Sequence, residues 1–407
     1  MIMKFMHLAD LHLDQSFSGI VTGDSRIKEI VLNANQKMFK NSITACLENN
    51  VSFVLITGDT FHQPKISIRT QKFFMEQLRR LEEKEIKVIL SFGNHDYYTE
   101  NKYWFEWPKN VILFNKEQVE TKKIVMKNGE KVAFSGFSYI GPWIEHSKLM
   151  EYPARGTDVD YQIGFYHGEI GSTGRYAPFQ VNELPHDYDY FGLGHIHVSQ
   201  EVTQRPLTLY PGTPQGHHRK EHQVNGIVCV ELSNTKPTYT WLPVASIHYQ
   251  NDEILLDAAE NRQMILEKLV TTILAMQRQK NLTVLSLKVR VSEQETAEIL
   301  REDFDSLFSY LQDELVRQSD AEILLTDLKI ELSAKKAFVM GFDSDLIDDL
   351  GHRFSEPSQF KLQGEDLFKN PLIAKYCEWD QSDIEKLLVN SSQLIKNEVD
   401  FGDEVRT

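Results

Sequence analysis

Short apolar runs alternate with small groups of polar residues along the first half of the chain. The runs lie at 5–9, 53–57, 88–92, 163–166 and 190–193. Four or five consecutive apolar residues have the length of a strand that is covered on both faces. Between the runs, apolar residues at helical spacing predict helices over 33–48 and 67–85. This alternation of strands and helices predicts an α/β fold.

The pattern changes after the third apolar run. Residues 123–136 are expected to form a hairpin, with Asn128 and Gly129 in a type I′ turn, because this pair tolerates the positive φ angles that the turn needs. Further strands are expected at 207–210, 226–232 and 238–243. A run of strands that follows alternating elements indicates a layered α/β sandwich rather than a purely parallel sheet.

The last third of the chain has a different periodicity. A helix is expected over 253–279, followed by alternating strands at 285–291 and 328–332 with an amphipathic helix over 293–317 between them. The remainder is acidic and of helical character, interrupted by two prolines. The expected domains are a catalytic domain at 1–245, a linker helix at 246–280, a capping domain at 281–342 and a helical tail at 343–407.

Composition narrows the class of protein. The chain has 407 residues, which is too long for one ordinary core. No apolar run approaches the roughly 20 residues of a membrane span, and the N-terminus is expected to be a first strand rather than a signal peptide. The three cysteines are scattered and lack Cys-x-x-Cys spacing, so we expect a cytoplasmic protein without disulfides or structural zinc.

The net charge of −15 argues against indiscriminate binding of nucleic acid, which needs a broad basic surface. Binding through a local patch stays open. Arg219 and Lys220 lie in the most basic short segment, 217–222, which is otherwise a solvated loop. The segment 65–72, with three basic residues, is a second candidate patch.

Five polar groups follow the apolar runs in a fixed order. They are Asp10-Leu11-His12, Gly58 to His62, Gly93 to Asp96, His167-Gly168, and Gly194 to His197. Strand ends gather at one edge of an α/β sheet, so these groups are expected to meet. The metal-ligand residue types among them are Asp10, His12, Asp59, Asn94, His167, His195 and His197.

These seven residues are enough for two cations if one carboxylate bridges them, and Asp59 is the natural bridge. Mixed oxygen and imidazole ligands fit manganese, iron or zinc better than calcium or magnesium. Two cations about 3.5–4 Å apart are a means of hydrolysing phosphoesters, because they clamp the attacking and leaving oxygens. The sequence therefore predicts a two-metal phosphoesterase.

His95 is next to the candidate ligand Asn94 and is expected to donate a proton to the leaving oxygen or to stabilise charge in the transition state. The alternative is that His95 only organises the ligands. Asp96 is expected to orient the other ring nitrogen of His95. His62 is a further imidazole near the bridge, which would contact the phosphate or a metal.

Several longer motifs resemble one family. They are His7 to Asp14 (HLADLHLD), Gly58 to His62 (GDTFH), Leu193 to His197 (LGHIH) and Tyr210 to Thr213 (YPGT). Through them the first 245 residues resemble the calcineurin-like metallophosphoesterase superfamily, in particular the SbcD-like DNA repair exonucleases and their bacterial YhaO-type subgroup. The resemblance implies an α/β fold, namely a layered α/β/β/α metallophosphoesterase sandwich with a small α+β capping domain and a helical C-terminal tail.

The resemblance also implies roles for single residues. Asp10, His12, Asp59 and His197 would hold one metal, and Asp59, Asn94, His167 and His195 the other. Two divalent ions are expected, with Mn²⁺ as the metal, and His95 as the catalytic residue. His62, Asp96, Arg219 and Lys220 are expected to surround the substrate or the ligands.

The implied function is a metal-dependent DNA exonuclease or endonuclease, as the nuclease subunit of a DNA repair complex. The expected partners are DNA, an SbcC-like SMC-type ATPase gripped by the tail, and a second copy of the chain bound through the region of 67–85; no membrane is expected. Two alternatives stay open: a small-molecule phosphoesterase or nucleotidase, and a DNA-end-binding scaffold with a vestigial site. The capping unit and tail favour the nuclease, and the complete set of ligand-type residues argues against the scaffold.

Overall fold

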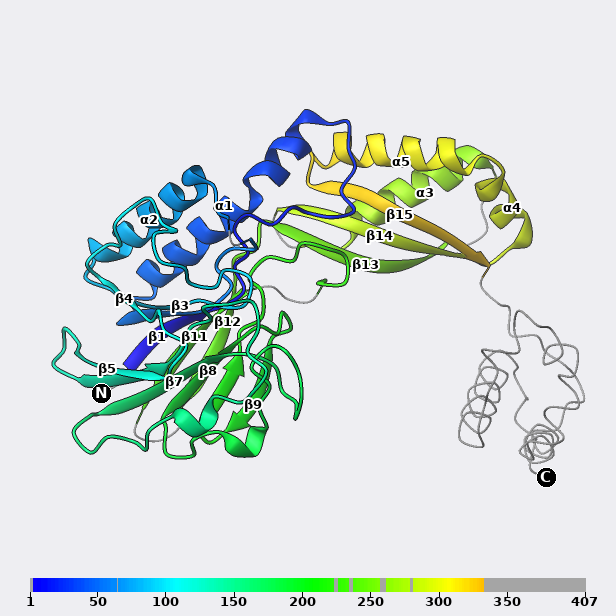
Figure 1. Cartoon of the computed structure of the whole chain (residues 1–407). Helices are drawn as coiled ribbons and strands as arrows, with labels where there is room; N and C mark the ends of the chain where they lie inside the picture. The colour runs from blue at the N-terminus through cyan, green and yellow to red at the C-terminus, as the bar shows by residue number, and fades with distance from the viewer. Residues whose placement is uncertain are drawn as a thin grey trace, which may run out of the picture. The chain divides into compact units, whose positions relative to one another are not determined.

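Two six-stranded β-sheets lie face to face in the N-terminal part of the protein (Figure 1). The computed structural model describes residues 3–63, 65–222, 226–233, 237–256, 261–278 and 281–332. The first sheet has the order β12-β11-β1-β2-β3-β4, in which β1 to β4 are parallel and β11 and β12 are antiparallel to their neighbours. Its strands are β1 (Met3–Leu8), β2 (Phe53–Thr57), β3 (Lys87–Ser91), β4 (Val111–Leu113), β11 (Gly226–Leu232) and β12 (Thr238–Pro243).

The second sheet has the order β5-β6-β7-β8-β10-β9. Strands β6, β7, β8 and β10 are parallel, while β5 and β9 run antiparallel at the two edges. Its strands are β5 (Glu120–Val125), β6 (Lys131–Gly136), β7 (Tyr161–His167), β8 (Tyr190–Gly194), β9 (Gln200–Gln204) and β10 (Leu207–Tyr210). The strands that precede the five polar groups are therefore the central parallel strands of the two sheets.

Aromatic side chains fill the space between the sheets. The Phe5 ring of β1 stacks on Phe53 of β2 at 4.5 Å between centroids, and meets Tyr190 of β8 edge to face at 5.0 Å. Ile163 and Leu209 of the second sheet are buried in the same cluster. Such rings stabilise the packing through the apolar area that they bury and through their preferred pair geometry, so this layer fixes the two sheets against each other.

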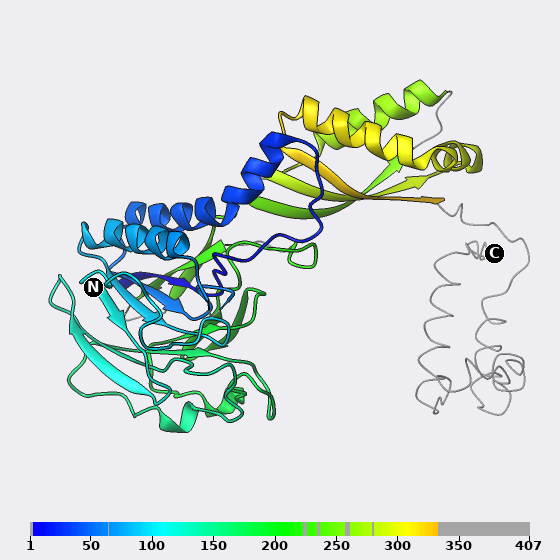
Figure 2. The ribbon, with the colours of Figure 1, turned by 45° about the horizontal axis from the view of Figure 1, so that its top comes forward.

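Helices α1 (Ser25–Glu48) and α2 (Ile68–Glu82) cover the outer face of the first sheet (Figure 2). The side chain of Asp24 accepts hydrogen bonds from backbone N–H groups in the first turn of α1, and Ser67 does the same for α2. Phe39 of α1 and Phe74 of α2 stack at 5.3 Å and are buried against the sheet. The apolar residues at helical spacing in the sequence therefore form the core between these two helices and the first sheet.

The outer face of the second sheet is covered by loops with two short 3₁₀-helices, η1 (Leu149–Glu151) and η2 (Val181–Glu183). Tyr139, Tyr166 and Phe179 are buried in this layer. The predicted layered sandwich is confirmed in its two sheets and in the helices over the first sheet. Within the described residues its outermost layer over the second sheet consists of these loops and 3₁₀ turns.

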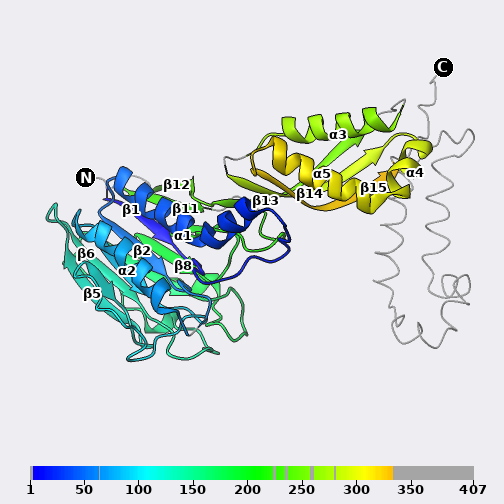
Figure 3. The same ribbon diagram turned by 90° about the horizontal axis from the view of Figure 1, so that it is seen from above.

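Three strands of the C-terminal third form a separate sheet in the order β13-β14-β15 (Figure 3). The strands are β13 (Ile247–Leu256), β14 (Leu282–Val291) and β15 (Ile323–Leu332), and the helices are α3 (Arg262–Ala275), α4 (Gln294–Glu302) and α5 (Phe304–Gln318). The chain divides into two compact units. The described residues of the first are 3–253, 266–278, 281–288 and 305–329, apart from the short gaps within 3–253; those of the second are 254–256, 261–265, 289–304 and 330–332.

Within the first unit, the N-terminal half of α1 extends the core beyond the sandwich. Ile27 and Ala34 are buried together with Tyr249, Val284 and Leu324. Helix α1 begins at Ser25 rather than near residue 33, because this extra length packs on the strands of the small sheet. The predicted domain boundaries stay a prediction.

The secondary structure expected near 246–280 is partly wrong. Residues 247–256 form β13, and the helix begins only at Arg262. Burial alternates at the two ends of β13, but the polar residues 250–253 in its middle hide that alternation in the sequence. The single helix expected over 293–317 is two helices, separated at Asp303, whose φ of −130° and ψ of 51° are not helical.

The hairpin of β5 and β6 has a different turn from the predicted type I′. Among its loop residues only Gly129 has a positive φ, +88°. The N–H of Gly129 donates to the Met126 carbonyl at 2.9 Å, and the N–H of Met126 donates to the Glu130 carbonyl at 2.8 Å. This is a three-residue loop in which a type I turn is followed by glycine in the left-handed region. No helix in the described part of the chain has the length and apolarity to cross a membrane.

Candidate metal centre

The carboxyl ends of β1, β2, β3, β7 and β8 bring the five polar groups together. Backbone hydrogen bonds join neighbouring groups directly: the N–H of Asp10 donates to the Gly58 carbonyl at 3.2 Å, and the N–H of His12 donates to the Asp59 carbonyl at 3.1 Å. On the other sheet the N–H of Gly168 donates to the Gly194 carbonyl at 3.1 Å. The side chains of the centre are therefore carried by a connected set of loops.

Two clusters of ligand-type atoms lie at this edge. The donor atoms of Asp10, His12 and His197 lie within 4.8 Å of one another, and so do those of Asp59, His167 and His195. These are two candidate sites for divalent metal ions. The carboxylate oxygen Oδ2 of Asp59 is 3.3 Å from His167 Nε2 and 3.9 Å from His12 Nε2, so Asp59 faces both clusters.

Asn94 completes the second cluster. Its carbonyl oxygen Oδ1 is 3.1 Å from His167 Nε2 and 3.1 Å from His195 Nδ1. The structure thus brings all seven sequence-predicted ligand residues to one edge. Buried oxygen and imidazole donors without a thiolate suit divalent cations of the manganese, iron and zinc kind, so the residues fit the predicted metals.

The backbone is strained where it carries these side chains. Asp10, His12, Asp59 and His195 have φ values of 51°, 41°, 51° and 99°. The left-handed region costs non-glycine residues about 1–3 kcal/mol each, and such residues gather at functional sites. Glycine permits the close approach at Gly93, where a Cβ atom would lie 2.2 Å from Asp59 Oδ1.

Backbone carbonyls determine the orientation of two imidazole rings. Nδ1 of His167 is 2.9 Å from the Thr57 carbonyl oxygen, and Nδ1 of His95 is 3.1 Å from the His62 carbonyl oxygen. A carbonyl can only accept, so in both rings Nδ1 carries the hydrogen. The lone pair of His167 Nε2 is then directed toward Asp59 and Asn94, as a metal ligand requires.

Asp96 has a different role from the one we expected. Its carboxylate accepts hydrogen bonds from the N–H groups of Asp59 (3.2 Å), Thr60 (2.8 Å), Phe61 (3.4 Å) and Gly93 (2.8 Å). The ring of His95 is bound to a carbonyl instead, as described above. Asp96 therefore fixes the loop that carries Asp59, because short buried loops leave several N–H groups that need an acceptor.

Electrostatics around the two clusters favour a bound cation. Burial raises the pKa of Asp10 to about 6. Burial also tends to raise the pKa of Asp59, but His167 and His12 lower it below its ordinary value. Burial lowers the pKa of His167 while Asp59 raises it, with a net rise to about 9. A cation bound between Asp59 and His167 would compete with a proton for Nε2 of His167.

His62 lies at the rim of the centre. Its ring stacks on His95 at 4.8 Å between centroids, and its Nδ1 is 3.4 Å from His12 Nδ1. Its backbone N–H donates to the Asp14 carboxylate at 2.6 Å. The stack and the carbonyl bond both tie His62 to the orientation of His95.

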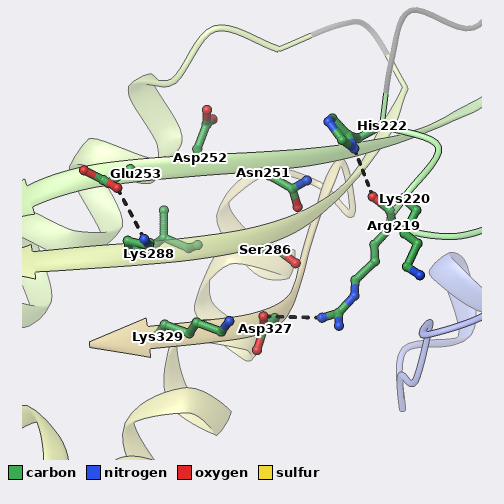
Figure 4. A pocket seen from close by; sticks show the side chains of 11 residues that line it. Arg219, Lys220, His222, Asn251, Asp252, Glu253, Ser286, Lys288, Asp327 and Lys329 are labelled. Carbon is green, nitrogen blue, oxygen red and sulfur yellow. Dashed lines mark hydrogen bonds and ion pairs between the residues drawn. The ribbon is translucent and has the colours of Figure 1, made fainter. Parts of the chain in front are cut away.

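Arg219 and Lys220 line a cavity of about 540 Å³ in the first unit, together with Lys288 and Lys329 (Figure 4). Four basic and three acidic side chains face this cavity. Arg219 lies 3.7 Å from Asp327, and Lys288 lies 3.8 Å from Glu253. Residues of the basic segment predicted from the sequence line this cavity. The sequence did not predict that Lys288 of β14 and Lys329 of β15 would join them.

Sequence analysis missed Glu221. Its carboxylate lies 2.6 Å from His197 Nδ1 and accepts from the N–H of His217 at 2.7 Å; only 11% of the side chain is exposed. Because the carboxylate accepts, His197 donates through Nδ1, and its Nε2 faces His12 Nε2 at 3.1 Å. A lone acid in a run of basic residues was the available signal.

Comparisons with known proteins agree with this geometry. A model of the calcineurin-like phosphoesterase family matches residues 3–199. The uncharacterized metallophosphoesterase YhaO of Bacillus subtilis is 32% identical over 276 residues, which cover 66% of this chain and 67% of YhaO. The DNA double-strand break repair protein Mre11 of Methanocaldococcus jannaschii is 26% identical over 231 residues, or 54% of this chain and 59% of Mre11.

The chain therefore belongs to the calcineurin-like metallophosphoesterases, a family of hydrolases, and the predicted resemblance is confirmed. Within the family it is similar to YhaO and, at lower identity, to Mre11. Among solved structures, GAP50, the anchor in the inner membrane complex of Plasmodium, matches with a TM-score of 0.38 and 13% identity over 60% of this chain and 85% of that chain. That likeness is too weak to carry an argument.

Replacing Glu221 with alanine is expected to weaken metal binding in the cluster of Asp10, His12 and His197, because His197 loses the acceptor that directs its Nε2. Loss of such a partner typically costs about 10–100-fold in metal affinity. Titration calorimetry with Mn²⁺ on wild type and Glu221→Ala measures this. Glu48→Ala, at an exposed acid of α1, is the control. If wild type, Glu221→Ala and Glu48→Ala bind Mn²⁺ with the same affinities, Glu221 does not position His197.

Proposed function

We propose that this protein is a metal-dependent DNA nuclease that hydrolyses phosphodiester bonds with two divalent cations. The observation that carries the proposal is the carboxylate of Asp59, which faces both clusters of ligand-type atoms. The similarity to Mre11, whose name is that of a DNA break repair protein, supports DNA as the substrate. Mn²⁺ is the proposed metal, because the donors mix oxygen with imidazole.

Bound cations in this centre would neutralise the phosphoryl oxygens, align the attacking and leaving oxygens, and lower the pKa of water. The protein's own contribution begins with Asp59. Its Oδ2 faces His12 and His167, while its Oδ1 accepts the backbone N–H of His95 at 2.9 Å. The residue proposed as the bridge therefore also fixes the backbone of the proposed proton donor.

His95 is proposed to donate a proton to the leaving oxygen. Its Nδ1 is engaged by the His62 carbonyl, so Nε2 is the atom that can hold a transferable proton. The stacked ring of His62 keeps the imidazole plane in place. An alkoxide is a poor leaving group unless it is protonated, so an imidazole positioned to protonate it lowers the barrier to hydrolysis.

The cavity at Arg219 supports a long anionic substrate. Lys220 directly precedes Glu221, which contacts His197, and Arg219 lies one residue before Lys220, so the basic segment adjoins the proposed metal centre. Lysine and arginine contacts to phosphates supply much of the affinity of DNA-binding proteins and carry no sequence information. A small phosphoester would have no use for this additional cavity.

The purified protein is expected to degrade end-labelled linear duplex DNA in Mn²⁺, to lose this activity in EDTA, and to regain it best with Mn²⁺. Asp59→Asn is expected to lose both activity and metal, because an amide cannot bridge two cations. Covalently closed circular DNA separates endonuclease from exonuclease action. Hydrolysis of small phosphoesters without DNA cleavage would favour the phosphoesterase alternative, and DNA binding without any hydrolysis would favour the scaffold.

Replacing His95 with alanine is expected to lower turnover of DNA about 10²–10⁴-fold, the usual contribution of a general acid, with nearly normal metal content. Turnover under saturating Mn²⁺ and elemental analysis of the purified variant give the two quantities. His146→Ala, at an exposed histidine, is the control for loss of an imidazole. A stoichiometric loss of metal in His95→Ala would make His95 a ligand.

We further propose that the protein is the cytoplasmic nuclease subunit of a DNA repair complex with an SbcC-like SMC-type ATPase. The tail at 343–407 lies outside the described residues, so the argument rests on its sequence and on the resemblance. Its apolar residues recur at helical spacing in an acidic context, as in 346–350 and 384–388. Short amphipathic helices gain stability by docking in a groove of a partner.

A homodimer through the region of 67–85 is likewise a proposal. Of the aromatic residues nearby, Tyr98, Tyr103 and Trp107 pack against the core under the helices, whereas Trp104 has 72% of its surface exposed. Trp104 is therefore the aromatic residue of that segment best placed to contact a second copy.

Deleting the residues after Gly341 is expected to abolish co-purification with the co-expressed ATPase and to leave Mn²⁺-dependent hydrolysis of a chromogenic phosphodiester intact. Pull-down and steady-state kinetics on the same preparations measure both. A truncated protein that aggregates or loses hydrolysis would show that the tail belongs to the fold, and unchanged co-purification would place the contact elsewhere.

A further inference from the structure

Three loops next to the candidate metal centre carry exposed apolar side chains. The loops follow β6, β7 and β8, which are parallel, so their carboxyl ends lie at the same edge of the second sheet. The side chains are Ile140 (53% exposed), Trp143 (56%), Ile170 (45%) and Val198 (46%). Single exposed apolar residues are ordinary, but several of them on the loops that border a polar centre indicate a contact surface.

Trp143 and Arg175 form the most specific part of this surface. The Arg175 guanidinium lies 5.6 Å from the centroid of the Trp143 indole. The two loops are also joined through their backbones: the N–H of Ile144 donates to the Arg175 carbonyl at 3.0 Å, and the N–H of Ala177 donates to the Ile144 carbonyl at 2.6 Å. An exposed ring is thus paired with a cation on a fixed backbone.

Contacts connect this pair to the second cluster of candidate ligands. The ring of Tyr176, next to Arg175, packs on the ring of His195 at 4.7 Å between centroids. Glu169 donates its N–H to the Tyr176 carbonyl at 3.0 Å, two residues after His167. The buried ring of Tyr139, on the segment that leads to Trp143, meets His167 edge to face at 5.7 Å. Both loops of the pair therefore touch the proposed metal ligands.

We propose that Trp143, supported by Arg175, is a stacking platform for an unpaired nucleobase of the DNA strand beside the scissile phosphodiester. The inference rests on the proposed nuclease function and names the part of the substrate that this edge recognises. Every base has a π face, so stacking on an aromatic ring tolerates any sequence. The guanidinium beside the ring favours a ligand that also carries phosphate, which distinguishes a nucleotide from an apolar peptide.

The platform favours bases at frayed ends or in single strands. In a duplex each base is already stacked between its neighbours, and freeing one face costs energy. An end or a single strand avoids that cost. The structure therefore assigns this edge to a strand with at least one free base next to the phosphodiester that is cut.

The test compares single-stranded oligonucleotides that carry an abasic residue at successive positions from one end with the same strand having all its bases. In Mn²⁺, Trp143→Ala is expected to raise KM for the complete strand about tenfold, as loss of one base–aromatic stack does. Trp143→Phe retains a ring and should remain close to wild type. On the strand whose abasic residue occupies the platform, wild type and Trp143→Ala should converge.

Two further variants guard against a folding artefact. Arg175 is exposed, so Arg175→Gln removes the cation without opening the core, and a rise in KM of about threefold is expected. Tyr310→Ala removes an exposed aromatic side chain from α5, away from these loops, and should behave as wild type. Circular dichroism of each variant verifies the fold.

A binding measurement provides a readout without catalysis. Oligonucleotides with 2-aminopurine at the end position, mixed with protein in EDTA, should lose fluorescence on binding to wild type and to Trp143→Phe. The quenching should be absent with Trp143→Ala. Stacking quenches this base analogue, so the signal reports the contact itself.

The outcomes separate this inference from the function on which it rests. DNA cleavage by wild type with unchanged KM and unchanged quenching in Trp143→Ala would overturn the platform and leave the nuclease in place; the apolar loops would then be a protein contact. Quenching that depends on Trp143, without any DNA cleavage, would retain the platform and overturn the nuclease. Neither cleavage nor quenching by wild type would overturn both.

Discussion

The carboxylate of Asp59 is the point on which the arrangement of the site depends. Its two oxygens face different partners, with Oδ2 near His12 and His167 and Oδ1 bound to the N–H of His95. Its own backbone is in the left-handed region, with φ at 51°, and Asp96 accepts its N–H. A buried carboxylate is unfavourable unless polar partners surround it, and here the neighbouring loops provide imidazole rings and a backbone N–H group as partners.

The sandwich supplies the rigidity that such a centre needs. Strained left-handed residues persist only where the surroundings hold them, and here the surroundings are two sheets packed through large rings. The stack of Phe5 on Phe53 lies on the strands whose ends carry Asp10 and Asp59. His7, two residues after Phe5 in β1, forms hydrogen bonds with Tyr190 of the opposite sheet at 2.8 Å and with Thr57 at 3.0 Å. The same strands therefore join the sheets and position the ligands.

Three kinds of side-chain group lie at the centre or are connected to it by contacts, and each has a separate physical role. The clusters of carboxylate, amide and imidazole groups suit divalent cations. The cavity lined by Arg219 and Lys220 has one more basic than acidic side chain, in a protein whose net charge is −15. The loops of Trp143 and Arg175 present an exposed ring with a cation. The proposed substrate, a phosphodiester chain with bases, would use all three at once.

The amino-acid sequence by itself determined the central strands and the seven ligand-type residues at their ends, since buried runs and the residues that follow them are local signals. It did not reveal β13, whose polar middle hides its alternation, or the break at Asp303. Only the tertiary structure decided the roles of Asp96 and Glu221. Their partners lie 36 and 24 residues away in the chain, at Thr60 and His197, and a carboxylate's acceptor role depends on which N–H groups folding brings within reach.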